Sequence, residues 1–248
     1  MKKLSIIICL LLSALSALAV TYTNETLHYK VMYKWGLISK QAGRATLTIK
    51  DAGNHYTSQL TARSESWVDH MYMVRDTLNG TILKDGFKPT FYEKIAHEGG
   101  EDKHDIVRFS YEGNNVTGHC LRHVVKDGEV KANQTQVLNA TGITVDMLSS
   151  FYYMRSLPFQ NWKKGHSLKL NIFSGKRKEL LTFVYQGLET IEVNNKRYTC
   201  YRITFKFTGD GGRKTSDDME AWITADKSRI PVQLEGKLPV GKVRCQLM

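Results

Sequence analysis

Proline, cysteine and the sequence motifs of catalysis are all scarce in this chain of 248 residues. Only four prolines occur, and none interrupts a stretch in which apolar and polar residues alternate. Because proline cannot donate a hydrogen bond to a neighbouring strand, these stretches can form long, fully paired strands. The motifs G-x-S-x-G, S-x-x-K and H-E-x-x-H, which mark common hydrolase sites, do not occur. We therefore predict no catalytic residue and no cofactor.

Cysteine is rare as well, and its spacing does not indicate a metal site. Cys9 lies in an N-terminal apolar run, which leaves Cys120, Cys200 and Cys245 for the rest of the chain. An odd number of cysteines leaves at least one unpaired within a monomer. Cys200 with Cys245 is the first pair to test. On a strand, His119 and His123 share a face that Cys120 does not, so three-ligand geometry fails without a bulge. A two-histidine site completed by His97 or His104 is the alternative, but histidines on polar strand faces are usually solvated, so no metal is predicted.

Long apolar runs are missing with one exception at the N-terminus. Leu4 to Leu18 follows Lys2-Lys3 and ends in the pattern Ala17-Leu18-Ala19. A short basic region, an apolar core and an A-x-A site are typical of a secretory signal peptide. We therefore predict a cleaved signal peptide over residues 1–19, a location in the bacterial periplasm, and a single β-rich domain over residues 20–248.

The charge balance is basic, with a formal net charge of +11. A basic surface attracts nucleic acid, anionic lipid or acidic glycan. Export makes nucleic acid unsuitable, so we predict none as a partner. An apolar or anionic molecule of the cell envelope remains, with peripheral contact with a membrane as a further option. The sequence does not indicate an oligomeric state.

Alternation of apolar and polar residues is the dominant pattern in the chain. Leu27, Tyr29, Val31, Tyr33 and Trp35 recur at every second position, as expected for a strand with one buried face. Similar stretches follow, separated by Gly, Asn and Asp at the turns. The predicted strands are 27–35, 45–49, 56–62, 73–83, 90–96, 106–111, 116–125, 168–172, 181–185, 201–207, 222–223, 230–234 and 243–247.

One stretch, Thr144 to Arg155, has the pattern of a helix. Its apolar residues recur at spacings of three and four, Asp146 lies in the first turn and Arg155 in the last, as the helix dipole favours. We predict a mainly β fold, in which a strongly curved antiparallel sheet, a half-barrel or open barrel, packs around this one central helix. An outer-membrane barrel is the alternative for alternating strands; the helix and the charges on the strand faces disfavour it.

Aromatic residues supply the candidate ligand contacts. The inner face of a curved sheet is either packed core or the lining of a cavity for an apolar ligand, and the sequence leaves both open. The candidate ligand-binding residues are Trp35, Phe151, Tyr152, Trp222 and Arg229.

Several segments together resemble a known family. These are residues 33–36 (YKWG), 41–43 (QAG), 146–155, and 219–232 with the pattern W-I-T-x-D-x-x-R-I-P-V. They resemble a family of exported bacterial proteins known as a domain of unknown function, in a form similar to that of Bacteroidetes. The family has no established activity, so no catalytic residue follows. Within the motif we interpret Asp226 as an acceptor of turn N–H groups and Arg229 as the partner of Asp226 or of another carboxylate. A looser analogy of fold is to the curved half-barrels of periplasmic lipoprotein carriers.

The leading functional hypothesis is non-enzymatic binding or handling of an apolar molecule of the cell envelope. One alternative is an envelope hydrolase, which requires a polar cleft where a histidine meets a Ser, a Cys or a carboxylate at hydrogen-bond distance. The other is the outer-membrane barrel, which requires a closed sheet with an apolar outer belt.

Overall fold

A computed structural model describes residues 21–209 and 219–248, so the predicted signal peptide lies outside the described residues. The first wall of the molecule consists of β1 (Glu25–Trp35), β2 (Ile38–Asp51), β3 (His55–Ser64), β4 (Val74–Leu83), β5 (Lys88–Glu98), β6 (Glu101–Glu112), β7 (Asn115–Lys126) and β8 (Glu129–Thr141). The second wall consists of β10 (Ser167–Phe173), β11 (Lys178–Val193), β12 (Lys196–Thr208), β13 (Met219–Thr224), β14 (Pro231–Lys237) and β15 (Lys242–Leu247). The remaining elements are β9 (Thr144–Val145), the helices α1 (Ser66–Tyr72) and α2 (Ser149–Ser156), and the 3-10 helices η1 (Asp85–Phe87) and η2 (Phe159–Asn161).

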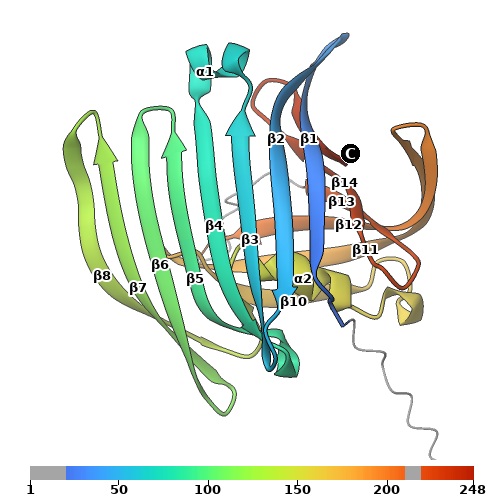
Figure 1. Ribbon diagram of the computed structural model, residues 1–248. Coiled ribbons are helices and arrows are strands. Elements are labelled where there is room, and N and C mark those ends of the chain that lie inside the picture. The colour runs from blue at the N-terminus through green and yellow to red at the C-terminus, as the bar shows by residue number, and fades with distance from the viewer. Residues whose placement is uncertain (1–20, 210–218) are drawn as a thin grey trace, which may run out of the picture.

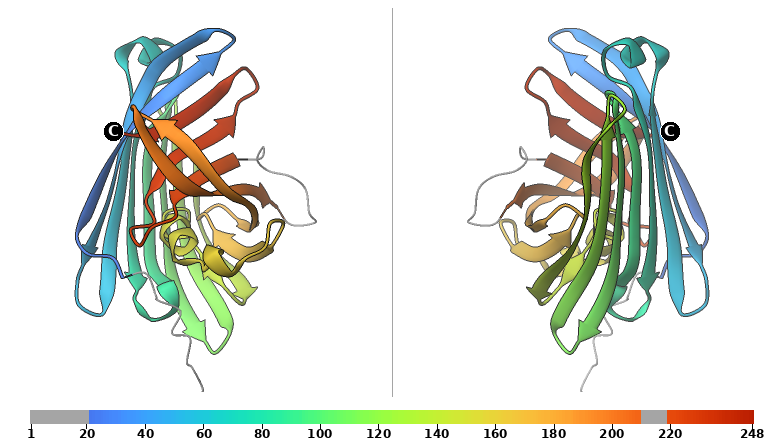
Figure 2. Two further views of the ribbon diagram at one scale, coloured as in Figure 1. Left: turned by 90° about the vertical axis from the view of Figure 1, so that its right-hand side faces the viewer. Right: turned by 90° about the vertical axis from the view of Figure 1, so that its left-hand side faces the viewer.

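All of these strands belong to one 15-stranded sheet with the order β8-β7-β6-β5-β4-β3-β2-β1-β15-β14-β13-β12-β11-β10-β9. Neighbours are antiparallel except β9 and β10, which are parallel. Figure 1 shows the first wall as a long curved meander, with the second wall crossing behind it and α2 between them. Figure 2 shows the two walls from the sides. The prediction of a mainly β, strongly curved antiparallel sheet is confirmed.

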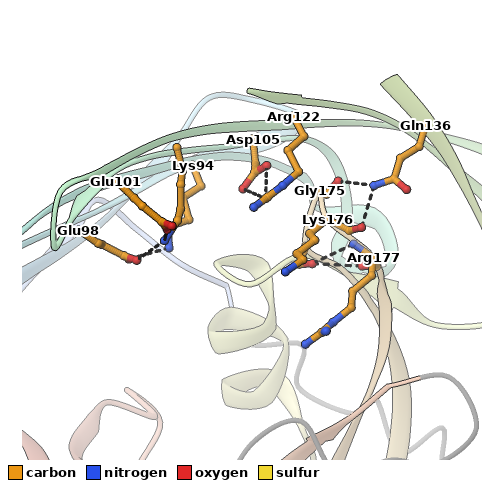
Figure 3. Close-up of polar contacts among 11 residues, drawn as sticks. Lys94, Glu98, Glu101, Asp105, Arg122, Gln136, Gly175, Lys176 and Arg177 are labelled. Atoms are coloured by element: carbon orange, nitrogen blue, oxygen red, sulfur yellow. Dashed lines mark hydrogen bonds and ion pairs between the residues drawn. The ribbon is translucent and has the colours of Figure 1, made fainter. Parts of the chain in front are cut away.

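The sheet is an open barrel because its two edge strands, β8 and β9, do not pair with each other. Near this seam Gln136 of β8 donates from Nε2 to the carbonyl oxygens of Gly175 and Lys176, both at 2.8 Å, in the turn between β10 and β11 (Figure 3). A side-chain contact therefore links the walls there. At the other side the walls are continuous, because β15 pairs with β1 and with β14.

The helix α2 starts later than the sequence predicts. Thr144 and Val145 pair with β10 as a short strand, and α2 begins at Ser149. Asp146 prepares this start: its Oδ1 accepts the backbone N–H groups of Leu148 and Ser149, each at 2.8 Å. The Ser149 hydroxyl donates to Asp146 Oδ2 at 2.8 Å. Asp146 is fully buried, and this burial raises its pKa to about 6.

Arg155 fixes the other end of α2 between the walls. Its guanidinium donates to both carboxylate oxygens of Glu25, at 2.7 and 2.9 Å, just at the start of β1. It also donates to the carbonyl oxygens of Arg229 at 2.7 Å and Ser228 at 3.0 Å, in the turn between β13 and β14. Only 1% of the Arg155 side chain is exposed. One buried cation thus joins the helix, the first wall and the second wall.

Two expectations about the elements need correction. The prediction of one central helix is not confirmed, since the described residues contain a second α-helix, α1, between β3 and β4. No strand was predicted over 129–141, where β8 pairs with β7 along its length. No described helix has the length and apolarity needed to cross a membrane.

Candidate functional site

Apolar side chains of β1, β2 and β15 line a cavity at one end of the barrel. On β1 the inward residues are Val31, Tyr33 and Trp35. A bulge at Val31 and Met32 shifts the register of β2, so that Lys40 lies opposite Tyr33 and Ile38 opposite Trp35. Residues directly opposite on antiparallel strands share a face, so Ile38 and Lys40 also point inward. These residues line a cavity of about 760 Å³, here called the first cavity.

The short helix α1 covers one side of the first cavity. Trp67, Val68 and Met71 of α1 belong to its lining. The helix is held to β2 because the Trp67 indole N–H donates to the Gln41 carbonyl at 2.7 Å. Lys40 Nζ lies 4.4 Å from the centre of the Trp67 ring, a cation–π contact. These contacts fix α1 against β2 at the side of the first cavity.

A second cavity of about 550 Å³ lies between α2 and the second wall. Phe151 and Met154 of α2 line it, together with Phe183 of β11 and Phe205 of β12. Leu238 and Val243 line both cavities, so the two lie on either side of these residues. The two cavities therefore adjoin at Leu238 and Val243.

The charges on the cavity walls are few and of unequal sign. The charged residues that line the first cavity are Lys40, Arg44 and Arg63, with no acidic residue among them. The second cavity is lined by Glu235 and Lys237, and Glu235 is already paired with Lys242 at 2.5 Å and Arg244 at 2.6 Å. The lining thus favours an apolar molecule and, at its charged margin, a negative group.

The inner surface of β4–β7 is different, because paired charges cover it, starting beside the first cavity, where Glu98 lies opposite the lining residue Val74. Lys94 lies 2.9 Å from Glu98, and Lys103 lies 3.1 Å from Glu98 and 2.8 Å from Glu101. Arg122 donates to both oxygens of Asp105, at 2.6 and 2.7 Å. Figure 3 shows the labelled members of this group, among them Lys94, Glu98 and Asp105, on the side of the sheet where α2 lies. We call this group the charged band: Asp76, Lys94, Glu98, Glu101, Lys103, Asp105 and Arg122.

The sequence candidates divide between the cavities and the packed core. Trp35 lines the first cavity and Phe151 the second. Tyr152, adjacent to Phe151 on α2, is fully buried and donates from its hydroxyl to the Thr48 carbonyl at 2.9 Å. Trp222 is 7% exposed and donates from its indole nitrogen to Glu189 Oε2 at 3.1 Å. The lining of neither cavity includes Tyr152 or Trp222.

Arg229 also lies outside both linings, and its predicted carboxylate partner is wrong. Its Nη2 donates to the amide oxygen of Gln160 at 2.7 Å, and its guanidinium lies 4.6 Å from the Tyr201 ring centre. Asp226 instead accepts the Ser228 N–H at 2.9 Å and the Thr224 hydroxyl at 2.8 Å. The interpretation of Asp226 as a turn acceptor is therefore confirmed.

The cysteines and histidines provide no assembled reactive site in the described residues. Cys120, Cys200 and Cys245 are free, and Cys200 and Cys245 lie on strands separated by β13 and β14. Among the described residues, no group of three or more His, Cys, Asp or Glu side chains is placed to hold a metal ion.

Two histidines do contact carboxylates, but at the surface. His97 Nδ1 lies 2.6 Å from Asp102 Oδ1, and His104 Nε2 lies 2.8 Å from Glu93 Oε1. The side chains of His97 and His104 are 49% and 45% exposed. They are solvated surface pairs, not the polar cleft that the hydrolase hypothesis requires.

The fold and these cavities define an open, barrel-like β protein with an apolar hollow on its inner surface. The chain belongs to the DUF3108 family, a family of proteins of unknown function, whose model matches residues 28–248. This confirms the expected membership of a domain-of-unknown-function family; the Bacteroidetes-like origin stays a prediction.

A solved structure with a similar fold is the crystal structure of a beta-barrel-like protein of domain of unknown function DUF1849 from Brucella abortus. The two share 10% sequence identity over 93% of this chain and 98% of that chain, with a TM-score of 0.62. At this identity the likeness shows the fold alone. No curated protein matches the chain.

Sequence reasoning missed Ile38, Met71, Leu238 and Val243 as lining residues. A signal for two of them was present, since Ile38 and Leu238 lie beside turns. Turns are usually built from Gly, Pro, Asn, Asp and Ser. Large apolar residues beside a turn are therefore unexpected, and their presence there is the signal.

Proposed function

We propose that this protein binds an apolar molecule in the hollow of its open barrel, without chemical conversion, in the periplasm after export. The observation that carries the proposal is the pair of adjoining apolar cavities, of about 760 and 550 Å³. Sites for small molecules usually occupy roughly 300–1,000 Å³ and are lined mainly by apolar side chains. The predicted candidates Trp35 and Phe151 would contact the molecule, and Tyr152, Trp222 and Arg229 would support the walls.

The experiment fills the hollow where the two cavities meet. N-phenylnaphthylamine, a probe that fluoresces in apolar surroundings, is titrated into purified protein and into the variant Val243→Trp. Because Val243 lines both cavities, the larger ring occupies space on both sides, and we expect probe binding to fall at least tenfold.

A matched control places the same substitution on the outside. Val130 of β8 is 61% exposed, and Val130→Trp should leave probe binding unchanged. Circular dichroism and the urea midpoint establish that both variants are folded. Equal probe binding by wild type and folded Val243→Trp would contradict the proposal.

The other hypotheses receive less support from the described residues. The hydrolase hypothesis lacks its polar cleft, as the two His–carboxylate pairs are solvated. The outer-membrane alternative requires a closed sheet, whereas β8 and β9 are unpaired edges. We therefore do not propose either.

A further inference from the structure

Exposed apolar side chains gather at one end of the barrel on three separate tips. The tips are the β1–β2 hairpin, the C-terminal end of α1 and the β14–β15 hairpin, and Figure 1 shows all three at the upper end of the molecule. Leu37 is fully exposed, at 104%, Met71 is 71% exposed and Val240 is 56% exposed. We define the rim as Trp35, Leu37, Ile38, Met71, Tyr72, Leu238 and Val240.

The rim is held in place by contacts between the tips and the walls. The Tyr33 hydroxyl donates to the Val240 carbonyl at 3.0 Å, which joins the first and third tips. Gly99 makes room for Tyr72, because a Cβ atom there would lie 2.4 Å from the Tyr72 ring. Apolar groups that are fixed in position and still exposed mark an interaction surface.

Three lysines without a carboxylate partner in the described part of the chain lie beside the rim. Lys34, Lys40 and Lys237 have no carboxylate partner among the described residues, although Lys40 lies over the Trp67 ring. The acidic residues nearby are already neutralised, since Glu65 pairs with Arg44 at 3.3 Å and Asp69 with Arg75 at 2.5 Å. The rim therefore complements a partner with a negatively charged outer layer and an apolar interior.

We propose that the rim docks onto a lipid bilayer that contains anionic lipids. Apolar and aromatic side chains flanked by lysines are what proteins insert at the boundary between headgroups and acyl chains. Three tips around an opening suit a deformable bilayer better than the flat, continuous face that a second copy of the chain would need. Several rim residues, including Trp35, Ile38 and Met71, also line the first cavity, so docking would bring the mouth of that cavity against the lipid. This inference goes beyond the proposed function and can be tested without it.

The test is co-sedimentation of the full mature chain with vesicles. Binding should be tight to vesicles of phosphatidylethanolamine and phosphatidylglycerol, weak to vesicles of phosphatidylcholine alone, and weakened by salt. Leu37→Asp should reduce binding by about tenfold or more, since an inserted leucine gains the free energy of burial. Lys34→Gln should reduce it by about fivefold, as expected for one lysine at an anionic surface.

Leu188→Asp is the matched control for Leu37→Asp. Leu188 is 62% exposed but lies on β11, away from the three tips, so this variant should bind vesicles like the wild type. Quenching by brominated lipids should be weaker for Trp35→Phe than for Trp222→Phe, because Trp222 is in the packed core.

Three results would overturn the proposal. They are no binding to either kind of vesicle, equal losses for Leu37→Asp and Leu188→Asp, and a dimer in solution that Leu37→Asp separates, which would assign the rim to a second copy. Probe binding to Val243→Trp is measured without vesicles, so each of these results leaves the proposed cavity function standing.

Discussion

The two regions of the inner surface use opposite means to occupy the space inside the barrel. In the charged band, long side chains from β4–β7 meet one another as ion pairs, such as Lys94 with Glu98 at 2.9 Å. In the apolar region, side chains of β1, β2 and β15 line a hollow instead. Paired charges are costly to desolvate again, so the charged band is unsuited to an apolar ligand. The comparison indicates that one part of the interior closes the fold and the other remains free to bind.

The largest expected effect is a loss of unfolding free energy when Arg155 is replaced, compared with replacement of Arg122 in the charged band. Arg155 joins α2 to both walls with bonds to Glu25, Ser228 and Arg229. Arg155→Met would leave the Glu25 carboxylate and two carbonyls without this donor, and should cost about 3–5 kcal/mol of unfolding free energy. Arg122→Met in the charged band breaks one bidentate pair at a site where Arg122 is 12% exposed, and should cost about 1–3 kcal/mol. Urea denaturation measures both, and a larger cost for Arg122→Met would reverse the roles assigned here.

The next effect is a dependence of stability on pH that comes from Asp146, at the start of α2. Burial raises its pKa to about 6 from the ordinary value of 3.8, so the native state holds this proton more tightly than the unfolded state does. The contribution of Asp146 to stability is therefore greatest below pH 4 and is lost as the pH rises through about 6, with a change of about 3 kcal/mol. Asp146→Asn should remove this change while an oxygen remains to accept the helix N–H groups.

The measurement for Asp146 is the difference in unfolding free energy between wild type and Asp146→Asn, followed by urea denaturation across this pH range. Asp226→Asn provides a control of opposite sign. Burial alone would raise the pKa of Asp226, but hydrogen bonds from Ser228 and Thr224 outweigh it and lower the pKa. Its stabilising contribution is lost as the pH falls through that lowered pKa. A flat difference curve for Asp146→Asn would contradict the assignment.

The smallest expected effects are those of substitutions at two neighbouring residues of α2. Phe151 lines the second cavity, whereas Tyr152 is buried in the core. Phe151→Ala should weaken N-phenylnaphthylamine binding by about tenfold. This corresponds to roughly half of the free energy gained when an aromatic side chain is fully buried. Tyr152→Phe loses its bond to the Thr48 carbonyl and should cost about 1 kcal/mol of stability with probe binding unchanged. If Tyr152→Phe impaired probe binding as strongly as Phe151→Ala, the division between cavity and core would be wrong.

Most of the sheet could be predicted because its strands have one buried face and therefore alternate. The exception is β8, where the run Asn133-Gln134-Thr135-Gln136 is polar throughout. As an edge strand it is mostly exposed, so burial imposes no alternation on it. The helix α1 was not predicted for a different reason. Its apolar residues Trp67, Val68 and Met71 recur at spacings of three and four, but the helix is only seven residues long and none of them is buried.

The candidate site could be predicted only in part, since alternation identifies an inner face without showing what lies opposite it. Trp35 and Trp222 both follow the inward or buried pattern of their strands, yet Trp35 borders the first cavity and Trp222 is packed. Trp222 packs with Cys200 and Val232, whereas its neighbours Ala221 and Ile223 belong to the larger core cluster. Both faces of β13 are buried, so alternation does not show which face Trp222 occupies. The register shift that turns Lys40 inward is likewise a property of strand pairing and not of the residue pattern.

The position of β15 between β1 and β14 has a consequence for the order of folding. The hairpins β1 to β8 need only local pairing and can form as the chain emerges, but one edge of β1 stays without a partner until β15 has been made. An unpaired strand edge is a template for pairing with other chains. Newly made protein is therefore most exposed to aggregation just before its C-terminal strand is in place, and loss of β15 would leave that edge permanently open.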